Sequence, residues 1–309
     1  MSTPDSMRRY LDYSPIVDRP VIRWPDGARL AVIVVVNVEH YAFMPAANPF
    51  KNPYPGVPAH PDVVGYAHRE YGNRVGFWRM LDALDRHAVP VTCSLNTDTL
   101  EMFPEVTAAM IERGWTYISH GTDNTTYLYG MTPEQELAFH REAIATVERI
   151  TGMRMKGLLG PSFTASAETP ALIAEAGMTF SLDWFVDDQP FPLKVPSGRL
   201  IGVPYSRELN DAFVMPGPPF SGFEADYFAQ ICRDQFDVLY REGADSGRVM
   251  TIALHPFYLG LPHHIRYLDE VLAYVTGHDG VWMAHADEVA DHYLEHCYDE
   301  AVARAHVVR

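Results

Sequence analysis

The sequence predicts a single α/β domain in which parallel strands alternate with helices and close into a barrel. Residues 29–37 form a continuous apolar, β-branched run, which is the pattern of a strand covered on both faces. From residue 72 onward, strand-like and helix-like segments alternate, which favours a parallel sheet with right-handed crossovers. No glycine-rich phosphate loop follows a strand, and this favours a barrel over an open doubly wound sheet.

The predicted elements follow from hydrophobic periodicity and helix boundary signals. The clearest helix begins with Thr132 as N-cap and Pro133 at its first position, and it ends at Gly152. Further helices are predicted at 77–87, 103–114, 168–177, 224–243 and 264–277. Strands are predicted at 29–37, 89–96, 115–120, 155–160, 178–184 and 248–255, with a strand pair or edge piece around 199–206 and a last strand and helix within 281–296.

Residues 41–71 are rich in proline and aromatic side chains, so we expect a long ordered loop. We interpret it as a lid whose Tyr41, Phe43, Phe50 and Tyr54 close over a pocket. The whole chain, 1–309, is expected to form one domain with a core of about 25–295. The extension 296–309 is a candidate for packing on another subunit, so a homo-oligomer stays an open option.

The composition excludes several classes of partner. A formal net charge of −16 repels phosphate backbones and anionic lipid surfaces, so neither nucleic acid nor a membrane is expected to bind. The first residues lack the apolar core of a signal peptide, which predicts a cytoplasmic protein. A small-molecule substrate is the partner expected instead. Cys93, Cys232 and Cys297 are far apart and odd in number, so we expect reduced thiols.

Polar side chains gather where the predicted strands end, and a barrel collects its active site at the carboxyl ends of its strands. Two histidines, one glutamate and a tandem aspartate are expected on this rim. The strand-end residues are Asn37 and Glu39 at the end of the first strand, His120 and Asn124 at the end of the third, Pro161 at that of the fourth, Trp184, Asp187 and Asp188 at that of the fifth, and His255 at that of a late strand.

Five segments in this order, NVEH, SHGTDN, LGPSF, SLDWFVDDQPF and IALHP, resemble the polysaccharide deacetylase superfamily over residues 25 to 295. The resemblance implies a distorted (β/α) barrel of about seven strands. The Pro-rich loop, GNRVGFWRMLDAL and DWFVDDQPF are most similar to the branch that contains metal-independent allantoinase and cyclic-imide hydrolases.

The resemblance also raises the question of whether the site binds a metal ion. Sugar deacetylases of the superfamily carry a paired aspartate after the first strand and an H-x-x-x-H motif, but here Asn37-Val38-Glu39 and His120…Asn124 stand in those places. Asn124 is a weaker zinc ligand than histidine. Glu39, His120 and Asn124 either hold one weakly bound divalent ion, such as zinc, manganese or nickel, or bind an amide directly with no metal.

Hydrolysis of an amide needs an activated water, a polarised carbonyl and a proton for the leaving nitrogen. Glu39 and His255 are the predicted acid–base pair, and we expect desolvation to raise the pKa of Glu39 toward neutrality. Asp187 and Asp188 are candidates for accepting hydrogen bonds from substrate N–H groups. Arg74 is a candidate for pairing with a substrate carboxylate. Asn37, His120, Asn124, Pro161 and Trp184 complete the predicted substrate-binding set.

These features predict a hydrolase that cleaves a C–N bond of a small linear or cyclic amide, imide or ureide. One alternative is a metal-dependent deacetylase of an amino-sugar or glycan. A second is a catalytically inactive ligand-binding barrel, for which Asn37 is the main argument because the family places its base there. Glu39, His120 and His255 together argue against inactivity.

Overall fold

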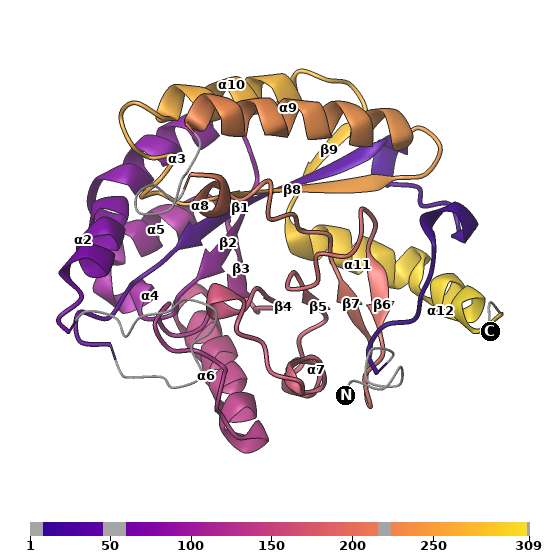
Figure 1. Ribbon diagram of the computed structural model, residues 1–309, viewed down its shortest axis with the longest axis horizontal. Coiled ribbons are helices and arrows are strands. Elements are labelled where there is room, and N and C mark those ends of the chain that lie inside the picture. Colours follow the sequence, from indigo (N-terminus) through magenta and orange to yellow (C-terminus); the bar gives the residue numbers. More distant parts are fainter. Residues whose placement is uncertain (1–8, 46–59, 216–223, 308–309) are drawn as a thin grey trace.

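The computed structural model describes residues 9–45, 60–215 and 224–307, and within them a mostly parallel sheet curls into a half-barrel (Figure 1). Its strand order is β6-β7-β5-β4-β3-β2-β1-β8, with β9 beside β1. The strands are β1 Leu30–Val38, β2 Val91–Leu95, β3 Thr116–Ser119, β4 Gly157–Leu158, β5 Phe180–Ser181, β6 Phe191–Leu193, β7 Leu200–Gly202, β8 Arg248–Leu254 and β9 Val281–Ala284. The distorted barrel is thus confirmed, with nine strands instead of about seven and with β6 antiparallel to β7.

Strand β1 lies at the centre of the sheet, and its pairing shows how the barrel is distorted. One edge of β1 pairs with β8 from Leu30 to Val36. The other edge pairs with β9 over its first four residues and then with β2 from Val34 onward. Every residue of β1 is buried, as its continuous apolar run predicts.

The two faces of the sheet are covered by different helices. Alternate residues of β1 pack with α3, α9 and α10 on one face, and the residues between them pack with α11 on the other. Figure 1 shows α9 and α10 lying together over the sheet. The helices are α2 Val63–Tyr71, α3 Phe77–Arg86, α4 Thr99–Met102, α5 Pro104–Glu112, α6 Pro133–Thr151, α7 Thr169–Ala176, α8 Asp211–Val214, α9 Ala225–Glu242, α10 Ile265–Thr276, α11 Ala286–His296 and α12 Tyr298–Val307.

Most predicted helices are confirmed by their local signals. Helix α6 has the Thr132 capping box with Gln135, proline at its first position and Gly152 in the left-handed conformation. The prediction of an irregular segment over 41–71 is wrong for its last part, because Val63–Tyr71 is helix α2. Asp62 caps this helix by accepting a hydrogen bond from the Gly65 N–H, and a π-helical turn, Gly72–Gly76, joins α2 to α3.

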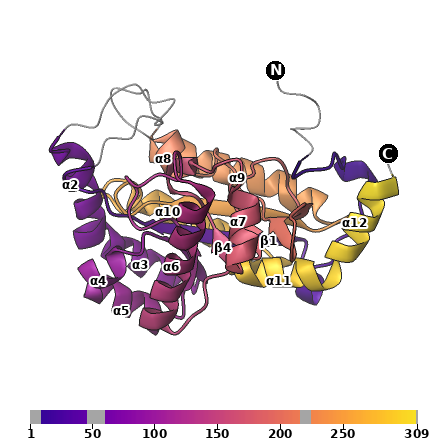
Figure 2. The same cartoon turned by 90° about the horizontal axis from the view of Figure 1, so that it is seen from below.

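Different helices form the two ends of the molecule. In Figures 1 and 2, α2 and α4 lie at one end, whereas α12 and the first described residues lie at the other. The extension predicted over 296–309 contains α12, which packs beside β6. No helix of the described residues is long and apolar enough to cross a membrane. Cys93, Cys232 and Cys297 are free thiols, as predicted.

Candidate active site

Three predicted residues converge at the carboxyl ends of neighbouring strands. Glu39 follows β1, His120 follows β3 and His255 follows β8. The Nε2 atoms of His120 and His255 lie 3.4 Å and 3.3 Å from the same oxygen, Oε1 of Glu39. All three side chains are at least 94% buried. The chain therefore places one carboxylate between two imidazoles in a site shielded from solvent.

Hydrogen bonds at the far side of each ring fix how the two imidazoles are protonated. The Nδ1 atom of His120 lies 2.7 Å from the Leu159 carbonyl oxygen, which can only accept, so Nδ1–H donates. The Nδ1–H of His255 donates to Asp211 Oδ1 at 2.5 Å, and the other oxygen of Asp211 accepts the His255 main-chain N–H at 2.8 Å. Each Nε2 is thus left facing Glu39. A hydrogen bond to the Glu39 carboxylate from either ring requires that ring to be positively charged.

The charges of the cluster set its pKa values. Burial raises the pKa of Glu39, but hydrogen bonds from His120 and His255 and the nearby Arg69 outweigh it and hold this pKa well below its usual range. Burial lowers the pKa of His255, but the negative charges of Asp211 and Glu39 outweigh it and raise this pKa to about 9. The expectation of a Glu39 pKa near neutrality is therefore wrong, because cationic partners dominate over desolvation.

Helix α2 and the π-helical turn, which follow the predicted lid, each contribute a residue that contacts Glu39. The Nε atom of Arg69 lies 3.6 Å from Glu39 Oε2, and its guanidinium stacks 3.5 Å from the centre of the Tyr41 ring. Asn73 donates to the Glu39 carbonyl oxygen at 2.8 Å. Arg74, the predicted substrate-binding arginine, is exposed on the π-helical turn. Arg69 is therefore the arginine of this segment that lies beside Glu39, and a role of Arg74 in substrate binding stays a prediction.

The turn after β3 is held by hydrogen bonds within itself and to the segments that follow β1 and β4. The Asp123 carboxylate accepts hydrogen bonds from the Thr125 N–H at 2.7 Å and the Thr126 hydroxyl at 2.6 Å, so it stabilises the turn itself. The Asn124 N–H donates to the His40 carbonyl oxygen at 2.9 Å, which ties the turn to the end of β1. The Asn124 side chain accepts from the Ser162 hydroxyl at 3.4 Å.

The segment after β4 faces Asn124 and carries unusual backbone angles. Pro161 is buried and contacts the turn at Gly121, whose φ is +81°. Ser162 and Phe163 have φ of +51° and +55°, which non-glycine residues seldom adopt. Such strain concentrates at functional sites, where the surrounding structure holds it. Asn37, by contrast, is buried in the sheet and donates to the Leu254 carbonyl oxygen at 3.2 Å.

The strand-five end contributes Asp183 to the site instead of the predicted Asp187 and Asp188. Asp183 Oδ1 accepts the Gly160 N–H at 2.8 Å, and its buried Oδ2 has no hydrogen-bond partner among the described residues. Burial raises the pKa of Asp183 to about 6, against opposing effects of the Gly160 hydrogen bond and of His120. A carboxyl group with an unused buried acceptor therefore lies near His120.

Asp187 and Asp188 lie at the opposite end of the sheet. Asp187 forms an ion pair with Arg19 at 2.6 Å, and the Asp188 carbonyl oxygen accepts the N–H of Val249, near the amino end of β8. His255 is six residues beyond Val249, which corresponds to about 20 Å at the rise of an extended strand. Trp184 packs edge-on against Tyr10 at 6.4 Å between ring centres. We therefore leave Asp187, Asp188 and Trp184 out of the site.

An aromatic cluster borders the site on the side of α8. Phe163, Phe185, Tyr205 and Phe213 pack with ring centres 4.9 to 5.9 Å apart. The Tyr205 hydroxyl accepts a hydrogen bond from Asn210 at 2.6 Å, and Asn210 caps the short helix that begins with Asp211. Phe185 is 36% exposed, so the cluster extends to the protein surface.

The donor set does not fit the three-ligand metal site that the sequence resemblance implies. Asn124 stands in the place of the second histidine, and a neutral amide oxygen is a weaker zinc ligand than imidazole. The predicted set of Glu39, His120 and Asn124 thus contains only two strong ligands, one fewer than such a site needs. Within the described part of the chain, no group of three or more His, Cys, Asp or Glu side chains is arranged to hold a metal ion.

Comparisons with known proteins agree with this fold. A family model described as polysaccharide deacetylase matches residues 69–181. A Schizosaccharomyces pombe protein named as a polysaccharide deacetylase is 30% identical over 296 residues, which cover 86% of this chain and 91% of the relative.

Two solved structures match nearly the whole chain. A Pseudomonas aeruginosa protein described as a polysaccharide deacetylase has a TM-score of 0.76 and 29% identity, over 90% of this chain and 96% of that one. PuuE allantoinase has a TM-score of 0.77 and 26% identity, over 93% of this chain and all of that one. The chain belongs to the polysaccharide deacetylase family, and it shares the superfamily and fold of an allantoinase.

Proposed function

We propose that this family member hydrolyses a C–N bond in a small cyclic or linear amide, imide or ureide. The observation that carries the proposal is the position of Glu39 Oε1 between the Nε2 atoms of His120 and His255. This arrangement supplies a carboxylate and a charged imidazole side by side in a buried site. The likeness to PuuE allantoinase supports the substrate class, because that protein's name describes an enzyme that acts on a cyclic ureide.

The proposed reaction uses Glu39 as base and His255 as acid. Water attacks the carbonyl carbon while Glu39 takes a proton from it, and His255 gives its Nε2 proton to the leaving nitrogen as the C–N bond breaks. Glu39 is then neutral and His255 is uncharged. Because Glu39 Oε1 and His255 Nε2 are 3.3 Å apart, a direct proton transfer between them restores the starting state.

Other residues bind or position the reacting groups in this proposal. Asp211 orients His255 and holds it protonated, and Arg69 keeps Glu39 ionised before water is deprotonated. The unused Oδ2 of Asp183 is suited to accept a hydrogen bond from a substrate N–H. Imides and ureides offer such groups on a planar ring, and the aromatic cluster beside α8 can contact the face of that ring.

A substrate panel tests this function. We expect turnover of at least one of succinimide, hydantoin and allantoin, and none of an N-acetylated amino-sugar oligomer. The alternative of a metal-dependent amino-sugar deacetylase is favoured by the names of two relatives. Exclusive turnover of the acetylated oligomer would decide for that alternative, and no turnover of any member by protein with a normal melting temperature would favour an inactive barrel.

Chelator treatment should leave turnover within about twofold, because the proposed steps use side chains only. Asn124→Ala should raise the KM or abolish turnover without changing the metal content, since the Asn124 N–H binds the carbonyl oxygen of His40, the residue next to Glu39. Elemental analysis of the purified protein accompanies both measurements. Stoichiometric zinc, nickel or manganese, with activity lost on its removal and regained on its return, would contradict this prediction.

The pH dependence should report the protonation of His255. Its pKa is raised to about 9, so kcat/KM should be constant at neutral pH and fall as the pH rises through about 9. Asp211→Asn removes a negative charge that raises this pKa, so the falling limb should move to lower pH. Measurement of kcat/KM from about pH 6 to about pH 10 checks both statements. An unmoved limb in the folded variant would exclude Asp211 from this role.

A further inference from the structure

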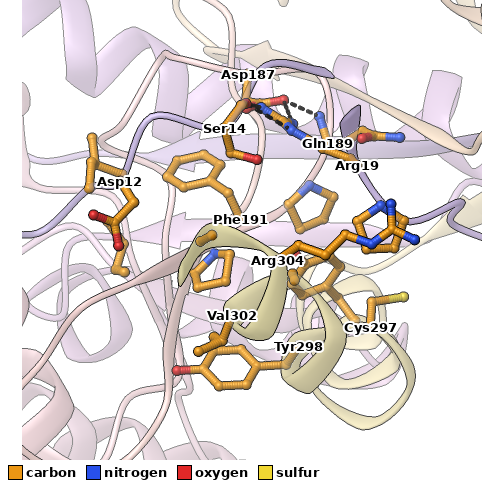
Figure 3. A pocket seen from close by; sticks show the side chains of 18 of the residues that line it. Asp12, Ser14, Arg19, Asp187, Gln189, Phe191, Cys297, Tyr298, Val302 and Arg304 are labelled. Atoms are coloured by element: carbon orange, nitrogen blue, oxygen red, sulfur yellow. Dashed lines mark hydrogen bonds and ion pairs between the residues drawn. The ribbon is translucent and has the colours of Figure 1, made fainter. Parts of the chain in front are cut away.

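A cavity of about 770 Å³ lies at the end of the molecule that holds α12, away from the candidate active site. Its walls come from the first described segment of the chain, from residues 186–195 including β6, and from α11 and α12. Figure 3 shows the ion pair of Arg19 and Asp187 at one end of this cavity, with Tyr298 and Val302 of α12 at the other. The volume is in the range of small-molecule sites in proteins.

The register of the central strands separates this cavity from Glu39 and His255. Gln189, which lines the cavity, donates to the Gly247 carbonyl oxygen, just before β8 begins. Ile22, also in the lining, accepts the Gly247 N–H at 3.0 Å through its carbonyl oxygen. The cavity is thus next to the amino end of β8, whereas His255 follows its carboxyl end. A ligand here would occupy a second site.

The lining is mainly apolar and contains rings. Phe191 and Tyr298 face the cavity in Figure 3, and Pro20, Pro190 and Pro192 also contribute to its walls. Val186 is 56% exposed, so apolar surface continues from the cavity to the outside. Such a surface favours a ligand with an apolar body, because burial of that body removes both surfaces from water.

The charges around the cavity indicate the polar end of that ligand. Five charged residues that the structure describes line it, and four of them form two pairs: Arg19 with Asp187 at 2.6 Å and Lys194 with Asp12 at 3.0 Å. The fifth is Arg304, whose side chain is 54% exposed. Its acidic partner, Glu300, is an exposed neighbour on the same helix at 3.2 Å, and such surface pairs contribute little.

The lining therefore has one cation in excess, although acidic residues outnumber basic ones by 40 to 24 in the whole chain.

We infer that this cavity binds a small apolar monocarboxylate, with its hydrocarbon part against Phe191, Tyr298 and Val302 and its carboxylate at Arg304. A guanidinium and a carboxylate form charge-assisted hydrogen bonds with two donors and two acceptors. The inference does not depend on the function proposed for the Glu39 cluster.

Octanoate is the probe for this site, and isothermal titration of the full-length protein is the measurement. We expect saturable binding of one octanoate per chain and much weaker binding of octanamide, which has the same body without the charge. Arg304→Gln should weaken octanoate binding about tenfold, the loss expected for one charge-assisted contact. Val302→Trp should abolish binding by filling the cavity. The matched control is Arg149→Gln, a surface arginine of α6 that should bind octanoate normally.

Several results would overturn the inference. They are the absence of saturable octanoate binding to the wild-type protein, equal affinity for octanamide, and unchanged affinity in folded Val302→Trp, which would place the ligand elsewhere. Sedimentation measures whether a second copy of the chain fills the cavity instead. A dimer that Val302→Trp dissociates and octanoate leaves intact would assign this face to self-association.

Discussion

Glu39→Gln should preserve the fold and lower kcat by about 10³-fold, because it keeps the shape of the side chain and removes the proton-accepting carboxylate. The variant also leaves the cations of His255 and Arg69 without the negative charge between them. We therefore expect a lower pKa of His255 and an altered pH profile in the residual activity. Steady-state kinetics and thermal unfolding of the same preparation measure these effects separately.

Glu101→Gln provides the matched control for this substitution. Glu101 pairs with Arg149 on the surface, where an ion pair contributes at most about 1 kcal/mol to stability. Its kcat and melting temperature should therefore stay close to those of the wild-type protein. If Glu39→Gln lost only a few-fold in rate at an unchanged melting temperature, Glu39 would have no part in the chemistry.

The fold could be predicted from the sequence because its strands and helices carry strong local patterns. The buried run of β1 and the capping box of α6 each specify an element within a few residues. Strands β4 and β5 have only two residues each, so their pairing depends on neighbouring strands more than on their own pattern. A strand pair was one option around 199–206, but the sequence did not place its partner at β6, because Phe191–Leu193 contains a proline and follows the turn-like Asp187 and Asp188.

The convergence of Glu39, His120 and His255 was predictable because parallel strands bring their carboxyl ends to one rim. Asp211 was missed because it lies 44 residues before His255 in sequence, at the start of a helix of four residues. Arg69 was missed because the Pro-rich composition of the preceding segment hid the helix that carries it. Proximity of this kind depends on tertiary packing, for which a single sequence gives no local signal.

The error over Asp187 and Asp188 has a similar cause. The chain leaves the rim after Asp183, and by Asp188 it has reached the amino end of β8. A strand-end rule holds for the first residues after a strand and fails once the connection runs back along the sheet. Phe50 and Tyr54 of the predicted lid lie outside the described residues, whereas Tyr41 contacts Arg69 beside the site.

His255→Ala should lower kcat by a factor on the order of 10² to 10⁴, the range for loss of a general acid. The residual activity should no longer fall as the pH rises through about 9, because the group whose pKa is raised to about 9 is gone. A purely structural role for His255 would lower stability and activity but leave that limb in place in the folded fraction. The pH profile therefore distinguishes the two roles.

His296→Ala is the matched control, since His296 is more than half exposed at the end of α11 and should keep both rate and pH profile. The substitution of His255 also leaves buried Asp211 without its partner, so thermal unfolding must accompany the kinetics. Addition of free imidazole should restore part of the rate if the cavity left by the ring admits it. A wild-type rate in folded His255→Ala would require another proton donor and would end the assignment of Glu39 and His255 as a pair.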